Sequence, residues 1–81
     1  MINLELETRL SLHDAVKEIK SYFGEGGLGL KLQQDDPGCL RFEGSGGFVN
    51  AVLCSSKGKT KIELHSKEWD QQVKAFAGKI W

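Results

Sequence analysis

The segment CLRFEGSGGFVNAVLCS, residues 39–55, predicts the β-hairpin around which the rest of the chain is arranged. Two runs rich in β-forming residues flank the pair Gly46-Gly47, and glycine readily adopts the positive φ angles of a two-residue hairpin turn. A turn at Gly46-Gly47 places Leu40 opposite Leu53, and further apolar residues meet on the same side. We therefore expect one face of this hairpin to belong to the hydrophobic core.

The other face of the hairpin carries polar residues, but it also carries Cys39, Phe48, Val52 and Cys54 beside Arg41. An antiparallel sheet with its core on one side normally presents polar residues to water on the other. Two interpretations are open. Single exposed apolar residues are ordinary on protein surfaces, whereas a patch of them indicates a contact surface for a protein partner or a second copy of the chain.

The two cysteines, Cys39 and Cys54, lie opposite each other in this register. They would occupy a hydrogen-bonded pair, with Cβ atoms about 5.5 Å apart, whereas a disulfide requires roughly 3.5 to 4.5 Å. A bridge would be strained, and a turn one residue earlier, at Ser45-Gly46, would separate the cysteines in any case. We expect two free thiols, in agreement with a reducing compartment.

Length and charge limit the classes of protein that the sequence can encode. The 81 residues suffice for one small domain, which we expect to span residues 1–81. Eleven Lys and Arg residues balance eleven Asp and Glu residues, so no net charge favours nucleic acid or an anionic membrane as partner. No apolar run approaches the roughly 18 residues of a membrane span. We expect a soluble cytoplasmic protein.

The two ends of the chain have recognisable element patterns. Residues 2–10 alternate between apolar and polar side chains, which predicts a half-buried strand. Ser11 is a suitable N-cap for the helix that follows, and Gly24 ends the helical pattern. Near the C-terminus, apolar residues recur at helical spacing from Trp69 to Ile80, and Ser66 is the expected cap.

Between the helices, residues 28–33 alternate leucine with other residues and predict a second strand. The loop QDDPG, residues 34–38, contains the strong turn signal Pro-Gly. A five-residue loop here places Leu32 beside Leu40, on the face already assigned to the core.

A tight turn at Lys57-Gly58 predicts the last hairpin and sets Leu53 against Ile62. Core residues again meet core residues. These elements predict an α+β protein of order β-α-β-β-β-β-α. We expect a five-stranded antiparallel sheet of strand order 1-5-4-3-2, with both helices packed on one face.

The same register leaves no expected metal or catalytic site. His65 opposes Asn50 and lies roughly 13 Å along the strand from Cys54, whereas zinc ligands lie about 2.0 to 2.3 Å from one point. No Cys-His or Ser-His-Asp grouping arises, so we name no catalytic residue and no cofactor.

The predicted layout resembles two known architectures, the β-α-β4-α unit of the TATA-binding-protein-like fold and a shortened helix-grip fold of START and polyketide-cyclase-like proteins. The hairpin at Gly46-Gly47 and the helix from Trp69 to Ile80 carry the resemblance. TATA-binding proteins use the helix-free face of the sheet on DNA. Helix-grip proteins hold a ligand between the last helix and the sheet. In this chain the latter would implicate Leu30, Phe42, Ala51, Trp69, Val73 and Phe76.

The leading functional hypothesis is a small non-enzymatic binding or interaction module. Its contact surface would be the open face of the sheet around Phe48 and Val52, and its partner a protein or a second copy in a homodimer. The alternative hypothesis is a carrier of a small hydrophobic ligand between the C-terminal helix and the sheet.

Overall fold

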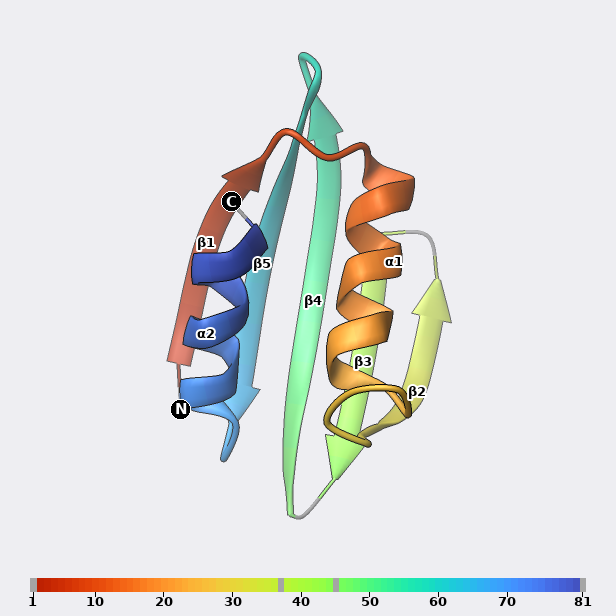
Figure 1. Ribbon diagram of the computed structural model, residues 1–81, viewed down its shortest axis with the longest axis vertical. Helices are drawn as coiled ribbons and strands as arrows, with labels where there is room; N and C mark the ends of the chain where they lie inside the picture. The colour runs from red at the N-terminus through yellow and green to blue at the C-terminus, as the bar shows by residue number, and fades with distance from the viewer. Residues whose placement is uncertain (1, 37, 45, 81) are drawn as a thin grey trace.

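The computed structural model describes residues 2–36, 38–44 and 46–80, and it has the expected α+β architecture (Figure 1). Five strands form one antiparallel sheet of order β1-β5-β4-β3-β2, as predicted. Both helices lie on one face of this sheet. The elements in chain order are β1 (Ile2–Thr8), α1 (Leu12–Phe23), β2 (Lys31–Asp36), β3 (Cys39–Gly44), β4 (Gly47–Ser56), β5 (Lys59–Lys67) and α2 (Asp70–Ile80).

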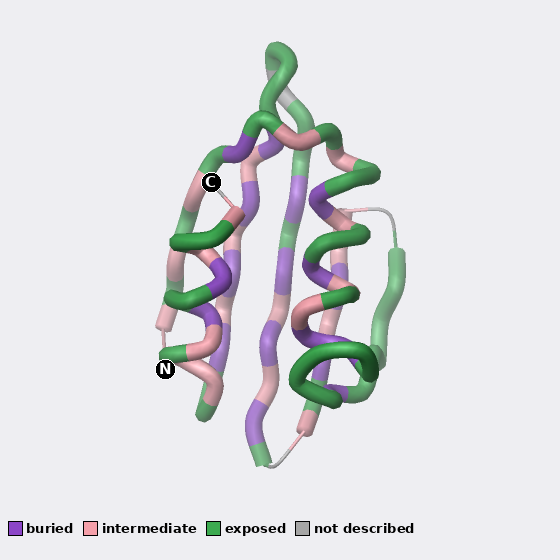
Figure 2. The backbone as a smooth tube through the Cα atoms, viewed as in Figure 1, coloured by how far each residue is buried: buried purple, intermediate pink, exposed green. Residues whose placement is uncertain are grey.

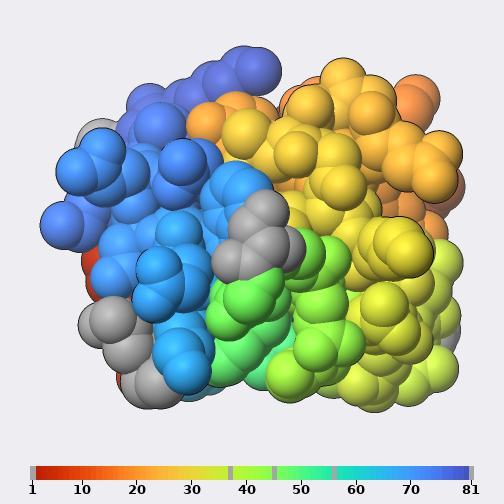
Figure 3. Space-filling view, turned by 90° about the horizontal axis from the view of Figure 1, so that it is seen from below, coloured from red at the N-terminus to blue at the C-terminus, as the bar shows by residue number. Residues whose placement is uncertain are grey.

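The hydrophobic core lies between the helices and the sheet, where inward-facing residues of β3, β4 and β5 alternate with residues that are more exposed (Figure 2). Phe23 of α1 is central to it. Its ring centroid lies 5.3 Å from that of Phe76 on α2 and 5.9 Å from that of Phe42 on β3. Seen from the end at which β3 runs into β4, the molecule has two layers, with the helices above the strand ends (Figure 3).

The predicted boundaries of α1 are confirmed. The Ser11 hydroxyl accepts a hydrogen bond of 3.1 Å from the Asp14 backbone N–H, which satisfies one of the free donors of the first turn. At the other end, the Gly24 N–H donates to the Lys20 carbonyl, and the chain leaves the helix. Among the residues described, neither helix is long and apolar enough to cross a membrane.

The predicted register between β4 and β5 is also confirmed, because Leu53 pairs with Ile62 and Asn50 with His65. Lys57 and Gly58 both have positive φ angles, 48° and 78°, as a two-residue turn between twisted strands requires.

The predicted register between β3 and β4 is wrong by two residues. Gly44 pairs with Gly47, so that Leu40 opposes Ala51 rather than Leu53. Gly46 has the positive φ angle, whereas Gly47 belongs to the strand, where a Cβ would overlap the Lys67 carbonyl oxygen. Gly47 is thus explained by the close approach of β5. A shift of two residues leaves every side chain on its predicted face.

The position of β2 also differs from the prediction. Asp36 pairs with Cys39, so the connection is shorter than the expected loop at 34–38, and β2 begins three residues later than expected. Pro37, part of the predicted turn, lies outside the described residues, as does Ser45 of the other predicted turn.

The pairing of β2 with β3 contains a β-bulge between Leu32 and Gln34, where the register shifts. Leu32 therefore lies beside Phe42 rather than Leu40, and on this edge strand it is 39% exposed.

The predicted cap of α2 is wrong as well. Ser66 is a buried residue of β5, which continues to Lys67 because it pairs with β1 on one side and β4 on the other. The Ser66 hydroxyl donates to Asp70 Oδ1 at 2.6 Å. Trp69 precedes the helix, and its indole N–H donates to the Gly44 carbonyl at 3.1 Å.

Candidate binding surface on the open face of the sheet

The face of the sheet that points away from α1 and α2 is here called the open face. Each strand contributes every second side chain to it, and the register fixes which of these side chains are neighbours. Five polar residues, one from each strand, pair directly across the sheet. This set is here called the polar row, and it consists of Gln34, Arg41, Asn50, His65 and Asn3.

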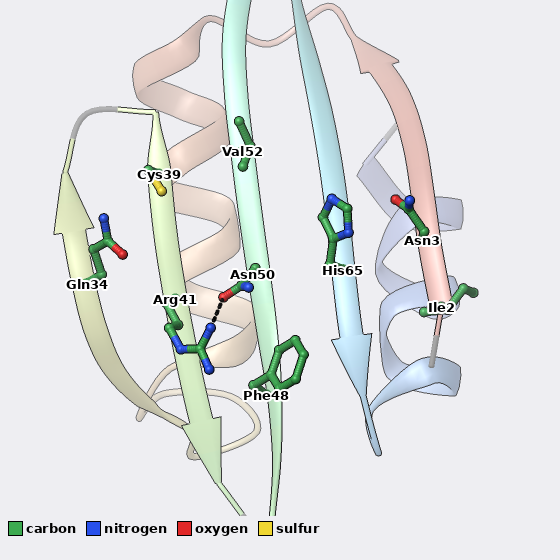
Figure 4. Close-up of a pocket in the computed structure, with 9 residues that line it drawn as sticks. All are labelled: Ile2, Asn3, Gln34, Cys39, Arg41, Phe48, Asn50, Val52 and His65. Atoms are coloured by element: carbon green, nitrogen blue, oxygen red, sulfur yellow. Dashed lines mark hydrogen bonds between the residues drawn. The ribbon is translucent and has the colours of Figure 1, made fainter.

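The polar row is bordered by apolar side chains on both sides (Figure 4). Phe48, two residues before Asn50, stands on one side. On the other side, Cys39 pairs with Val52, which is 44% exposed. Together with Ile2 near the β1 end, these residues and the polar row line an open depression of about 490 Å³, here called the transverse groove.

Arg41 is held in place by three neighbours on the open face. Its Nη1 donates to Asn50 Oδ1 at 3.2 Å, its guanidinium carbon lies 4.9 Å from the centre of the Phe48 ring, and its Nη2 lies 3.8 Å from Glu43 Oε1. The bond to Asn50 orients that amide, so its NH2 group is directed toward β5 (Figure 4). A cation over an aromatic face gains about 0.5 to 1 kcal/mol at an exposed site.

Charged side chains lie beside the groove. Lys61 Nζ lies 3.2 Å from Glu5 Oε1, and this contact raises the pKa of Lys61 above its usual value. His65 Nε2 lies 3.9 Å from Glu63 Oε2. The open face therefore carries charge of both signs, as the balanced composition indicates.

The two cysteines share the open face but are not opposite each other. Cys39 pairs with Val52, and Cys54 lies two residues further along β4, where it pairs with Lys61. The predicted Cys39–Cys54 pair is wrong because of the register shift, and both residues are free thiols. Within the described ranges, no three His, Cys, Asp or Glu side chains gather closely enough to hold a metal ion.

The predicted partner-binding residues lie on one face but are divided into two groups. Phe48 is on one side of the polar row, where the guanidinium of Arg41 reaches its ring, and Val52, Cys39 and Cys54 are on the other. The sequence reasoning did not nominate Asn3, Gln34, Asn50 and His65 as binding residues. The outward position of Asn3, Asn50 and His65 follows from the alternation of their strands, whereas Gln34 reaches the open face only because of the bulge after Leu32. The alignment of the row depends on the register of the two edge strands.

The residues of the alternative ligand site are packed in the core. Leu30, Phe42, Ala51, Val73 and Phe76 are each at most 2% exposed. Phe23 lies between Phe42 and Phe76, so these side chains contact one another through it. Trp69 is partly buried against the same cluster. A ligand between α2 and the sheet would have to displace these contacts.

Comparison of the chain with models of known protein families and with curated proteins finds no match. The geometry of the open face is therefore the basis for the functional proposal.

Proposed function

We propose that this protein is a small non-enzymatic protein-interaction module and that the open face of its sheet is the contact surface. The observation that carries the proposal is the transverse groove, a depression of about 490 Å³ on the face that neither helix covers. Arg41 in the polar row and Phe48 beside it belong to residue types that are enriched at protein interfaces.

The size and composition of the open face suit one protein partner. The molecule measures 37 × 20 Å in the plane of the sheet. The area that these two lengths enclose is close to the roughly 800 Å² that each partner buries in an interface of standard size. The face combines apolar side chains on both sides of the polar row with charged residues such as Glu5 and Lys61. Protein interfaces contain both kinds of group, and a typical one makes about ten direct hydrogen bonds.

The strand and helix order agrees with the resemblance to the TATA-binding-protein-like fold, in which the helix-free face makes the contact. We propose that this chain uses the same face for a different class of partner. Binding to nucleic acid depends on an excess of Lys and Arg that replaces the counterions of phosphates. Here Lys61 and Arg41 each lie next to a glutamate, and the chain has no net charge.

The two natural cysteines provide a test that does not require the partner to be known. Cys39 lines the groove and Cys54 is exposed next to it. Alkylation of each thiol, quantified by mass spectrometry, is compared between dilute purified protein and intact cells that express the chain natively. We expect Cys39 to react several-fold more slowly in the cells, because the partner covers it.

The control is Phe48→Glu, which places a charge at the side of the groove and should abolish the protection of Cys39 while the circular dichroism spectrum stays unchanged. Equal reaction rates of Cys39 in cells and in dilute solution would contradict the proposal.

A further inference from the structure

The transverse groove runs across the strands, not along them. Its lining includes Gln34 from β2 and Asn3 from β1, which are the two edge strands, and the residues between them come from the other three strands. Neighbouring strands lie about 4.8 Å apart, so the polar row spans about 19 Å over its four interstrand steps. A ligand that uses the whole groove must therefore be long and narrow.

The polar row offers both donors and acceptors along this length. The Asn50 carbonyl already accepts from Arg41, and the Gln34 NH2 group already donates to Asp36 Oδ2 at 2.8 Å. The row therefore offers a ligand mainly the Asn50 NH2 group, the Gln34 carbonyl and both groups of the Asn3 amide. An extended peptide presents the same mixture, one N–H and one C=O for each residue other than proline. A chain that rises about 3.3 Å per residue places about six residues along the row.

The apolar borders complete the match to a peptide. Phe48 stands on one side of the row, and Val52 with Cys39 stands on the other. A peptide backbone over the row would direct side chains toward both borders. Apolar side chains placed there would be removed from water, which gains about 25 cal/mol for each Å² buried.

Other occupants fit the groove less well. The phosphates of a nucleic acid would need cations, but Arg41 is shared by Asn50 and Glu43. A peptide backbone carries a donor and an acceptor at nearly every residue, whereas a second copy packed face to face brings only its own five polar side chains to the row. Any group of either row that these side chains do not meet would be left unpaired. Such groups cost free energy when they are removed from water.

We infer that the partner contributes an extended peptide segment, which lies across the five strands in the transverse groove. Its backbone hydrogen-bonds to the polar row, and its apolar side chains contact Phe48 on one side and Val52 with Cys39 on the other. This inference rests on the proposed function and specifies the chemistry of its partner.

The test uses the complete chain, labelled with ¹⁵N, and linear eight-residue peptides selected against it from a randomised display library. The reporters are the side-chain NH2 resonances of Gln34, Asn50 and Asn3. We expect a single selected peptide to shift all three, because only a ligand that crosses the sheet reaches both edge strands. The dissociation constant should rise about tenfold in Asn50→Leu, which removes hydrogen bonds but keeps the volume.

The matched control is Gln71→Leu on α2, which makes the same kind of change at an exposed position away from the groove and should leave the dissociation constant unchanged. N-methylation of the central backbone amides of the peptide should weaken binding to a similar extent as Asn50→Leu. These results would support the inference.

The inference is overturned if no peptide is enriched on the wild-type protein relative to the Asn50→Leu protein. It is also overturned if only the Asn50 resonance on β4 shifts, or if N-methylation of the peptide does not weaken binding. It is also overturned if cellohexaose or an oligothymidine produces the three shifts and the peptides do not. If these peptide experiments fail but Cys39 is protected in cells, the peptide inference is wrong and the proposed function still stands.

Discussion

Arg41 on β3 and Asn50 on β4 are joined on the open face by a hydrogen bond of 3.2 Å, and the same guanidinium lies against the ring of Phe48. The arginine therefore connects the polar row to one of its apolar borders. Its position depends on the observed register, in which Arg41 and Asn50 are a direct cross-strand pair. The predicted register would have placed Arg41 opposite Val52 instead.

Arg41→Ala should lower the free energy of unfolding by about 1 kcal/mol, because it removes a partly exposed hydrogen bond and a cation–aromatic contact. Urea denaturation followed by circular dichroism measures the change. Lys31→Ala on the exposed edge strand β2 is the control and should change stability by less than about 0.5 kcal/mol. Equal effects of the two substitutions would show that Arg41 makes no specific contribution.

Leu30 and Leu32 are two residues apart and provide a test of the observed position of β2. Leu30 is 2% exposed and Leu32 is 39% exposed. Leu30→Ala should cost about 2 to 5 kcal/mol, as expected for a buried leucine, whereas Leu32→Ala should cost about 0.5 kcal/mol or less. Thermal and urea unfolding of both variants checks this. A large loss for Leu32→Ala would instead favour the register predicted from the sequence.

The hydrogen bond from Ser66 to Asp70 makes stability depend on pH. It is the main reason that the pKa of the Asp70 carboxyl lies below its usual value. Because the folded-state pKa is depressed, ionised Asp70 stabilises the fold above the unfolded pKa of about 3.9, and this contribution is lost as the pH falls through the folded-state pKa. Asp70→Asn should therefore be less stable than the wild type at pH 6, and the difference should shrink toward pH 2.

Urea denaturation at a series of pH values measures this difference. Ser66→Ala in the Asp70→Asn background is the control, since the pH dependence attributed to Asp70 should already be absent there. A wild type and an Asp70→Asn variant that differ by the same amount at pH 2 and pH 6 would rule out the linkage.

Sedimentation velocity tests whether a second copy is the partner. If the open face binds an extended peptide, the purified protein should sediment as a monomer at micromolar concentrations, and Phe48→Glu should have the same mass. A dimer that dissociates in Phe48→Glu while the fold is retained would identify a second copy as the partner. It would overturn the peptide inference but not the proposed function.

The sequence by itself determined the fold class, the order of the strands and the face to which the side chains of β1, β3, β4 and β5 belong. These features depend on local signals, such as Ser11 and Gly24 at the ends of α1, the turn at Lys57-Gly58, and the alternation of apolar residues along each strand. Because the side-chain period of a strand is two, even a register error of two residues left the core face correct.

Only the tertiary structure decided which residues are neighbours across the sheet. Gly47 is a strand residue of β4 that must be glycine, because β5 approaches it too closely for a side chain. The bulge before Gln34 brings that residue level with Arg41. Neither cause is visible in the local sequence, because both depend on contacts between strands. The polar row and the groove along it arise from those contacts, so the candidate site could be assembled only in three dimensions.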